Sequence, residues 1–188
     1  MTDFRSAASL GARIQAARKA RGMSARELAV AIGGVPSQAT IENIELGRKA
    51  AVDVVHLLNI AMALRVPPSY LLAPMGNPDD VLDLPGLSQD FDRMTAIEFD
   101  SWLSSAADDL YRPKSIEERN AVNELQALRA WKSQLTEVAR LETALELERQ
   151  SSVEHEAGYL RATEHRLADA RKEASRLQAF LSSAGWRV

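Results

Sequence analysis

The sequence predicts an all-α protein, and three observations indicate this fold class. Apolar residues recur at helical spacing through most of the chain. Side chains that cap helix N-termini stand before these runs, and glycine or proline follows many of them. Residues 115 to about 182 contain no proline and only one glycine, Gly158, which predicts a very long helix.

Composition narrows the class of protein further. A chain of 188 residues, 46% of them hydrophobic, can hold a small domain and an extension. Cysteine is absent, which excludes disulfides, thiolate nucleophiles and cysteine-based zinc sites. No N-terminal segment is apolar enough for a signal peptide, and no run of about 18 residues could span a bilayer. We therefore expect a cytoplasmic protein.

Charge divides the chain into three parts. Residues 1–74 carry a net charge of +4, residues 75–114 carry −6 and residues 115–188 carry −1. Only the first part has the sign that attracts phosphate. We therefore predict a basic N-terminal domain over residues 1–74, an acidic helical connector over residues 75–114 and a long helix over residues 115–188.

The first two helices of the N-terminal domain are predicted from an amphipathic run and a cap. Residues 7–21 form an amphipathic helix that ends at Gly22. Ser24 and Glu27 then make a capping box, which begins a second helix. Gly33 stops that helix.

Three more helices complete the predicted domain. Ser37 is the N-cap of a third helix, which Gly47 closes. A fourth helix spans residues 52–66 and is stopped by Pro67. A short fifth helix covers residues 69–72. Five helices of this length can bury one small core.

The third predicted helix has small polar side chains on its outer face. Its apolar residues, Ile41 and Ile44, point inward. Amide and hydroxyl groups can read base edges in the major groove and cations contact phosphates, so this pattern favours double-stranded DNA as the partner. The residues that we predict to read bases are Gln38, Ala39, Thr40 and Asn43. Those that we predict to contact phosphates are Arg26, Ser37, Arg48 and Lys49.

Three consecutive blocks of this region resemble the helix-turn-helix of the phage-repressor-like family (lambda repressor and Cro type, the XRE family). The first block consists of Arg18, Gly22, Met23, Ser24, Glu27, Leu28 and Ala29. The second consists of Ser37, Gln38, Thr40, Ile41, Ile44, Glu45 and Gly47, and the third of Ile60, Ala61, Ala63, Leu64 and Val66. The resemblance covers roughly residues 7–73. The turn at residues 33–36 is about two residues longer than the family's usual turn.

The resemblance implies a five-helix lambda-repressor-like DNA-binding domain. It implies a transcription regulator of repressor type, a class that includes phage and prophage immunity repressors, that binds paired half-sites as a dimer. It also implies that Arg18 pairs with Glu45 and so supports the recognition helix. A second hypothesis is a protein-docking module of antitoxin or anti-repressor type. That hypothesis predicts an apolar outer face on the third helix, whereas Gln38, Thr40 and Asn43 are polar. Glu42 is unfavourable beside phosphate, and this residue keeps the hypothesis open.

The acidic connector contains one strong helix signal. Thr95 and Glu98 form a capping box, and the helix that follows is predicted to run to Tyr111. Phe99 and Trp102 lie on its apolar face. We expect this face to pack against the N-terminal domain (residues 1–74, the head) or against the long helix (residues 115–188, the tail), in preference to a ligand.

Ser115 and Glu118 begin the longest helical run, which is one very long helix or two. Its apolar stripe fits a coiled-coil a/d pattern with one four-residue offset. As one helix it would be about 100 Å long, at 1.5 Å per residue. The stripe residues that we predict to mediate oligomerisation are Leu128, Trp131, Leu135, Val138, Leu160, Leu167, Leu177 and Leu181.

This stripe needs a helical partner, and two arrangements supply one. The arrangement that we favour is a homodimeric coiled coil, parallel or antiparallel. The other is a hairpin that bends near Ser151 and Ser152 or near Gly158 and packs on itself.

The sequence contains no pattern that indicates catalysis or metal binding. His155 and His165 do not have the spacing of residues on one helix face. Glu154-His155-Glu156 lacks the second histidine of a metalloprotease motif, because Tyr159 stands at that position. Phosphate-binding glycine loops and nucleophile elbows are also missing. We therefore predict no enzymatic activity, no cofactor and no metal.

Overall fold

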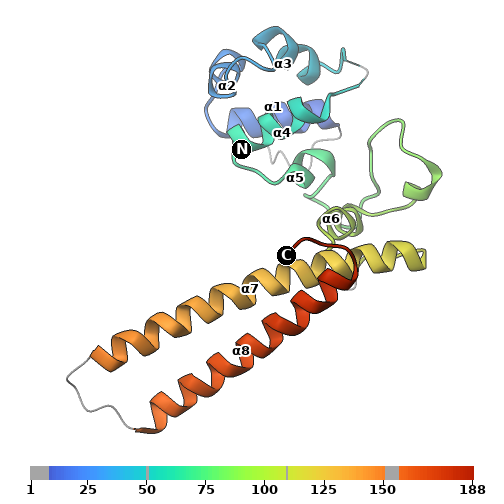
Figure 1. Ribbon diagram of the computed structural model, residues 1–188. Coiled ribbons are helices and arrows are strands. Elements are labelled where there is room, and N and C mark those ends of the chain that lie inside the picture. The colour runs from blue at the N-terminus through green and yellow to red at the C-terminus, as the bar shows by residue number, and fades with distance from the viewer. Residues whose placement is uncertain (1–8, 50, 109, 151–156) are drawn as a thin grey trace. The chain divides into compact units, whose positions relative to one another are not determined.

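The computed structural model describes residues 9–49, 51–108, 110–150 and 157–188, and its regular elements over these ranges are helices (Figure 1). The all-α prediction is confirmed. The chain forms two compact units, Met1–Tyr111 and Arg112–Val188. The first contains α1 (Leu10–Ala20), α2 (Ala25–Ala31), α3 (Gln38–Glu45), α4 (Val54–Leu64), α5 (Pro68–Leu72), the 3-10 helix η2 (Gln89–Phe91) and α6 (Ala96–Ser104). The second contains α7 (Ile116–Gln150) and α8 (Ala157–Ser183).

Hydroxyl side chains cap the helices of the first unit where the sequence predicts them. Ser24 with Glu27, and Thr95 with Glu98, form complete capping boxes at α2 and α6. Ser37 accepts from the backbone N–H of Thr40 at the start of α3. These caps satisfy backbone donors that a helix N-terminus otherwise leaves without partners.

The bounds of two helices, α1 and α4, differ from the prediction. α1 is described from Leu10, and the predicted start at residue 7 lies outside the described residues. α4 is shorter than the predicted range of residues 52–66. Asp53 accepts from the N–H of Val55 at 2.8 Å and so caps α4 at that point, and Arg65 ends it in the left-handed conformation, with φ 51°.

The core of the head lies among α1 to α5, which surround it in Figure 1. α1 contacts α3, α4 and α5, and α2 contacts α3 and α4. The buried apolar residues of this core are Ile14, Ala17, Leu28, Ala29, Ile41, Ile44, Leu57, Ile60, Ala61, Leu64 and Leu71. They are the inward positions of the helical patterns, so burial of these stripes explains why the five helices pack together.

The connector helix α6 is much shorter than predicted. It ends at Ser104, because Ser105 takes the left-handed conformation with φ 49° and the N–H of Ala106 returns to the carbonyl of Ser101. The Ser101 hydroxyl also donates to Asp108 at 2.6 Å and holds the turned segment. The prediction of a helix to Tyr111 is therefore wrong.

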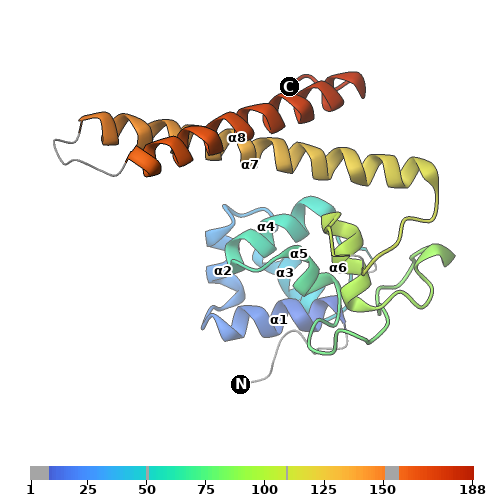
Figure 2. The ribbon, with the colours of Figure 1, turned by 90° about the horizontal axis from the view of Figure 1, so that it is seen from below.

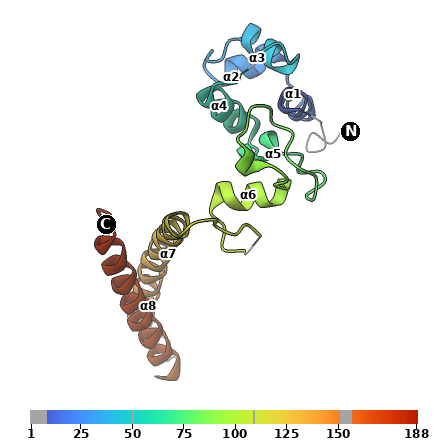
Figure 3. The ribbon, with the colours of Figure 1, turned by 90° about the vertical axis from the view of Figure 1, so that its right-hand side faces the viewer.

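The aromatic face of α6 packs against its own unit, as expected. Phe91 and Trp102 meet edge to face, with ring centroids 5.2 Å apart, and Phe99 stacks at a tilt beside them. Buried Ala73, at the end of α5, belongs to the same cluster. Figure 3 shows α6 next to α5. The connector up to Tyr111 thus belongs to the same compact unit as the head.

α7 and α8 of the second unit run antiparallel and pack along their lengths (Figure 2). Trp131 packs with Leu177 and Leu181 in one apolar cluster, and Leu141 packs with Leu167 in another. Ion pairs flank these clusters, from Arg166 to Glu137 and from Arg171 to Glu142. The Trp186 indole donates to Glu124 at 2.9 Å and covers the end of the hairpin.

The hairpin changes the interpretation of the predicted oligomerisation stripe. Trp131, Leu167, Leu177 and Leu181 are buried within the hairpin, Leu128, Val138 and Leu160 are partly buried there, and Leu135 is 40% exposed. A second copy is therefore not needed to cover the stripe, and the hairpin is the arrangement that the structure has. The predicted bend at Ser151 and Ser152 lies outside the described residues. Among the described helices, none has the length and apolar character to cross a bilayer.

Candidate nucleic-acid interface

α3 lies very close to α1 because Gly11 leaves room for it. A Cβ atom at Gly11 would overlap the backbone carbonyl of Ile44. Ile41 and Ile44 are buried beneath α3, which fixes the face that the helix turns to solvent. Glycine at this position thus allows two helix backbones to approach more closely than any side chain would permit.

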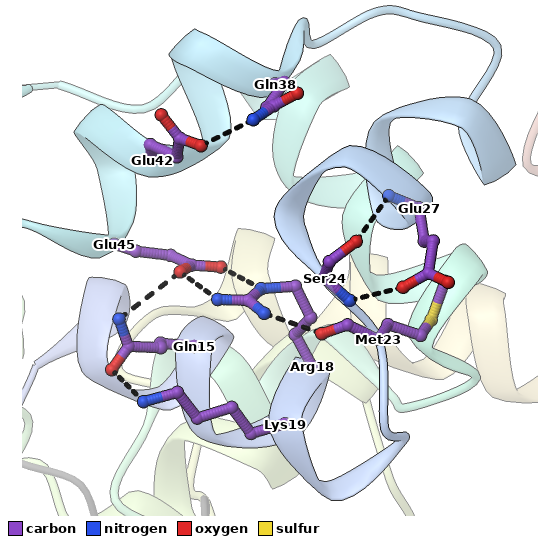
Figure 4. A network of polar contacts seen from close by, with 9 residues as sticks. All are labelled: Gln15, Arg18, Lys19, Met23, Ser24, Glu27, Gln38, Glu42 and Glu45. Atoms are coloured by element: carbon purple, nitrogen blue, oxygen red, sulfur yellow. Dashed lines mark hydrogen bonds and ion pairs between the residues drawn. The ribbon is translucent and has the colours of Figure 1, made fainter.

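A buried ion pair fastens the C-terminal half of α3 to α1. Arg18 Nε lies 2.7 Å from Glu45 Oε1, and Arg18 Nη2 lies 2.6 Å from Glu45 Oε2 (Figure 4). Arg18 Nη1 also donates to the carbonyl of Met23 at 2.6 Å, which ties in the start of α2. The hydrogen bonds that Arg18 donates to Glu45 raise the pKa of Arg18 above its ordinary value, and burial opposes this only in part. These are the two residues that the resemblance pairs.

Around Arg18 and Glu45 the network extends along the surface of α1. Gln15 Nε2 donates to Glu45 Oε2 at 3.4 Å, and Lys19 Nζ donates to Gln15 Oε1 at 3.1 Å. The four side chains fix the position of α3 by directional contacts as well as by apolar burial.

The turn between α2 and α3 is long but anchored. It runs from Ile32 to Ser37, with Gly33 and Gly34 at φ values of 80° and 86° that favour glycine. The Val35–Pro36 peptide bond is cis, and Pro36 is buried. The Asn59 amide of α4 donates to the Val35 carbonyl at 3.0 Å.

The predicted base-reading residues lie on the accessible side of α3. Gln38, Ala39 and Asn43 are exposed, and Thr40 is half-buried. Thr40 Oγ1 lies 3.1 Å from Ser37 Oγ, so the N-cap hydroxyl is linked to one of these four residues. The inner side of α3 is apolar and the outer side is polar, as a helix that enters a groove requires.

A surface hollow of about 360 Å³ lies at the C-terminal end of α3 and in the segment that follows. It is lined by Thr40, Asn43, Arg48 and Lys49. Two predicted base readers and two predicted phosphate contacts are therefore brought together at one place. Within the residues that the structure describes, neither Arg48 nor Lys49 forms an ion pair, so both cations can receive an anion.

The other two predicted phosphate contacts lie apart from this hollow. Arg26 is exposed at the second position of α2. The Ser37 hydroxyl, at the N-terminus of α3, already accepts from the backbone N–H of Thr40.

Sequence reasoning missed one contact on the outer face. Gln38 Nε2 donates to Glu42 Oε1 at 2.8 Å, one helical turn away (Figure 4). The spacing of four residues was the available signal, because side chains so placed meet on a helix surface. No group of three or more potential metal ligands occurs in the part of the chain that the structure describes.

Comparison with known proteins identifies the class of the head. Residues 14–71 match the family model described as helix-turn-helix. The match covers all of α2, α3 and α4, most of α1 and most of α5. No curated protein and no solved structure matches the chain. The first unit therefore contains a helix-turn-helix DNA-binding domain, and α3 is its second helix.

Proposed function

We propose that this protein is a sequence-specific DNA-binding transcription regulator that places α3 in the major groove. One observation carries the proposal: the outer side of α3 presents Gln38, Ala39 and Asn43 to solvent while its inner side is fixed by buried Ile41 and Ile44. A short helix with this polarity fits the major groove, where base edges offer donors and acceptors. The helix-turn-helix match supports the same conclusion.

Each base-reading side chain has a distinct chemical role in this proposal. Gln38 forms a bidentate pair with adenine, since its amide offers one donor and one acceptor. Ala39 contacts a thymine methyl group. Thr40 and Asn43, at the edge of the hollow, make further contacts to base edges or to the adjoining backbone.

Phosphate contacts hold the helix at the correct depth. Arg48 and Lys49 line the hollow beside α3 and bind one backbone segment. Arg26 and the N-terminus of α3 at Ser37 face a second segment. The net charge of +4 over residues 1–74 supplies the attraction to DNA that does not depend on sequence.

We also propose that two copies bind paired half-sites and act as a repressor. One short helix presents few base-reading side chains, so a useful specificity requires two heads on one site. Leu125, Leu135 and Phe180 remain exposed on the hairpin, and they offer apolar surface for pairing of two hairpins. A bound dimer represses by occupying its site, which requires no contact with another protein.

The test is selection of bound sequences from a random duplex pool. Full-length protein, a fragment that ends at Tyr111 and full-length Gln38→Ala are compared at low and moderate salt. We expect an inverted, paired motif with the full-length protein and a weak single half-site with the fragment. Gln38→Ala should lose preference at one base pair per half-site, by about 1 to 3 kcal/mol.

Two results would contradict the proposal. Unchanged sequence preference in Gln38→Ala would show that α3 is not the reading helix. Absence of an enriched motif at both salt concentrations would favour a protein-docking role for the head.

A further inference from the structure

The outer face of α3 carries an acidic residue, although DNA is acidic as well. Glu42 is exposed, and its carboxylate accepts from the Gln38 amide at 2.8 Å. Neither side chain is needed for the core, so packing does not account for the pair. A carboxylate ion has acceptors only, and the part of the Gln38 amide that faces it is therefore the NH₂ group.

This contact determines how Gln38 presents its amide. A free glutamine amide can rotate by about 180°, which exchanges its donor and its acceptor. Recognition of adenine requires the acceptor opposite N6 and the donor opposite N7. In the rotated state Gln38 Oε1 would face a Glu42 oxygen, and two acceptors repel each other. The donor–acceptor contact thus favours one of the two amide orientations.

The contact leaves the groups that adenine requires. The Gln38 NH₂ group has two hydrogens, and Glu42 takes one of them. The second hydrogen and Oε1 can still form the two bonds of a bidentate pair. Gln38 therefore loses rotational freedom without losing its ability to read the base.

We propose that Glu42 is a specificity-determining residue that positions Gln38 for adenine. This inference rests on the function proposed above, because it requires α3 to be the reading helix. Glu42 strengthens discrimination at the base pair that Gln38 reads, and its negative charge weakens binding to all DNA sequences alike. Glu42 thus lowers the affinity for DNA in general and raises the selectivity at one base pair.

Two substitutions separate the hydrogen bond from the charge. Glu42→Ala removes both, whereas Glu42→Gln removes the charge and keeps an oxygen that can accept from Gln38. Equilibrium dissociation constants of the full-length protein are measured on two duplexes. One is the selected site, and the other is the same site with the base pair that Gln38 reads replaced by another (the changed site). The same measurements are made in the Gln38→Ala background. Thermal unfolding of each variant confirms that it is folded.

We expect Glu42→Ala to lower the ratio of the dissociation constant on the changed site to that on the selected site about threefold to tenfold, as for loss of one hydrogen bond of ordinary strength on an exposed surface. Glu42→Gln should retain part of that ratio. Both variants should bind non-specific DNA more tightly, and by the same factor. In the Gln38→Ala background, Glu42→Ala should leave the ratio unchanged.

Three results would overturn the inference. These are an unchanged ratio in Glu42→Ala, an equal loss in Glu42→Ala and Glu42→Gln, and an effect of Glu42→Ala that persists without Gln38. Gln38→Ala by itself reports on the proposed function. If Gln38→Ala loses the preference for the selected base pair while the Glu42 variants keep that preference, only the positioning role fails. If Gln38→Ala keeps its preference, the assignment of α3 fails and the positioning role falls with it.

Discussion

Arg13 and Asp83 form a two-point ion pair across 70 positions of the chain, with Nη1–Oδ2 and Nη2–Oδ1 distances of 2.8 Å. Arg13 lies in α1 with 0% of its surface exposed, and it also donates to the carbonyls of Leu71 and Leu72. Those carbonyls end α5 and lack partners within that short helix. One guanidinium therefore joins the first helix of the head, the last helix of its core and the connector.

Asp83→Asn should destabilise the first unit. A buried guanidinium would lose its counter-charge, while two backbone carbonyls would still bind it. We expect a loss of about 2 to 4 kcal/mol in the free energy of unfolding, below the upper range for a broken buried pair because Asp83 is 25% exposed. Urea denaturation of the fragment that ends at Tyr111 measures this, because Trp102 is its single tryptophan and its fluorescence reports on the connector.

Asp79→Asn is the matched control for Asp83→Asn, since Asp79 is exposed in the same acidic segment. It should change stability by less than about 0.5 kcal/mol. Equal effects of the two substitutions would mean that the connector is not held to the head by this pair.

Glu45→Gln should loosen α3 from α1. The substitution removes the charge that faces buried Arg18 and keeps the shape of the side chain. We expect about 2 to 4 kcal/mol of destabilisation, together with weaker DNA binding, because the reading helix loses its fixed position. Thermal unfolding and binding to the selected site measure the two effects.

Glu42→Gln is the same chemical change at a carboxylate that acts on Arg18 by charge without a hydrogen bond, and it serves as the stability control for Glu45→Gln. It should leave stability within about 0.5 kcal/mol of the unsubstituted protein. The pKa of Arg18 is raised above its ordinary value, so the stabilisation from its charge is complete below the pKa of the unfolded chain and is lost only as pH rises through the raised pKa. Arg18 should therefore contribute no pH dependence between about pH 5 and 10, and a transition there assigned to Arg18 would contradict the structure.

Leu181→Ala should destabilise the hairpin. Leu181 is 0% exposed and packs with Trp131 and Leu177, so its truncation leaves a cavity. We expect a loss of about 2 to 5 kcal/mol. Urea denaturation reports it through tryptophan fluorescence, because Trp131 and Trp186, two of the three tryptophans of the chain, belong to this cluster.

Leu147→Ala is the corresponding control on the hairpin, because Leu147 is 64% exposed. It should change the free energy of unfolding by less than about 0.5 kcal/mol. A cost as large as that of Leu181→Ala would mean that Leu147 is covered in solution, and sedimentation of the two variants would then show whether a second copy covers it.

Local signals in the sequence predict the head well. The Ser24 and Ser37 caps and the inward positions of α3 depend on residues within one or two turns, so the sequence alone places them. The burial of Arg13 depends on a partner 70 positions away and on the carbonyls of α5. A charged side chain on an amphipathic helix is normally solvated, and no local pattern distinguishes this one.

The second unit shows a different limit of sequence analysis. The apolar stripe that contains Leu167 and Leu181 indicates that a helix must cover it, but a helix of the same chain and a helix of another chain satisfy it equally well. The sequence also mispredicts the end of α6, for a related reason. Ser105 and Asp108 close that helix through contacts of the folded segment, whereas the apolar pattern continues to Tyr111.

Lys49→Ala should weaken DNA binding without changing its sequence preference. Lys49 lines the hollow beside α3, and a lysine that neutralises one phosphate releases about one counterion. The slope of log K against log salt should therefore become shallower by about 0.9 per bound chain. Titrations of the selected site and of a non-specific duplex, at several salt concentrations, measure both slopes.

Lys172→Ala removes the same charge from the exposed surface of α8, and it should leave both slopes unchanged. The two lysine variants have equal net charge, so a difference between them isolates a direct phosphate contact from the general field of the protein. Equal slopes in the two variants would place Lys49 outside the DNA interface. A changed base preference in Lys49→Ala would instead make this lysine a base reader, and the hollow would then face the groove.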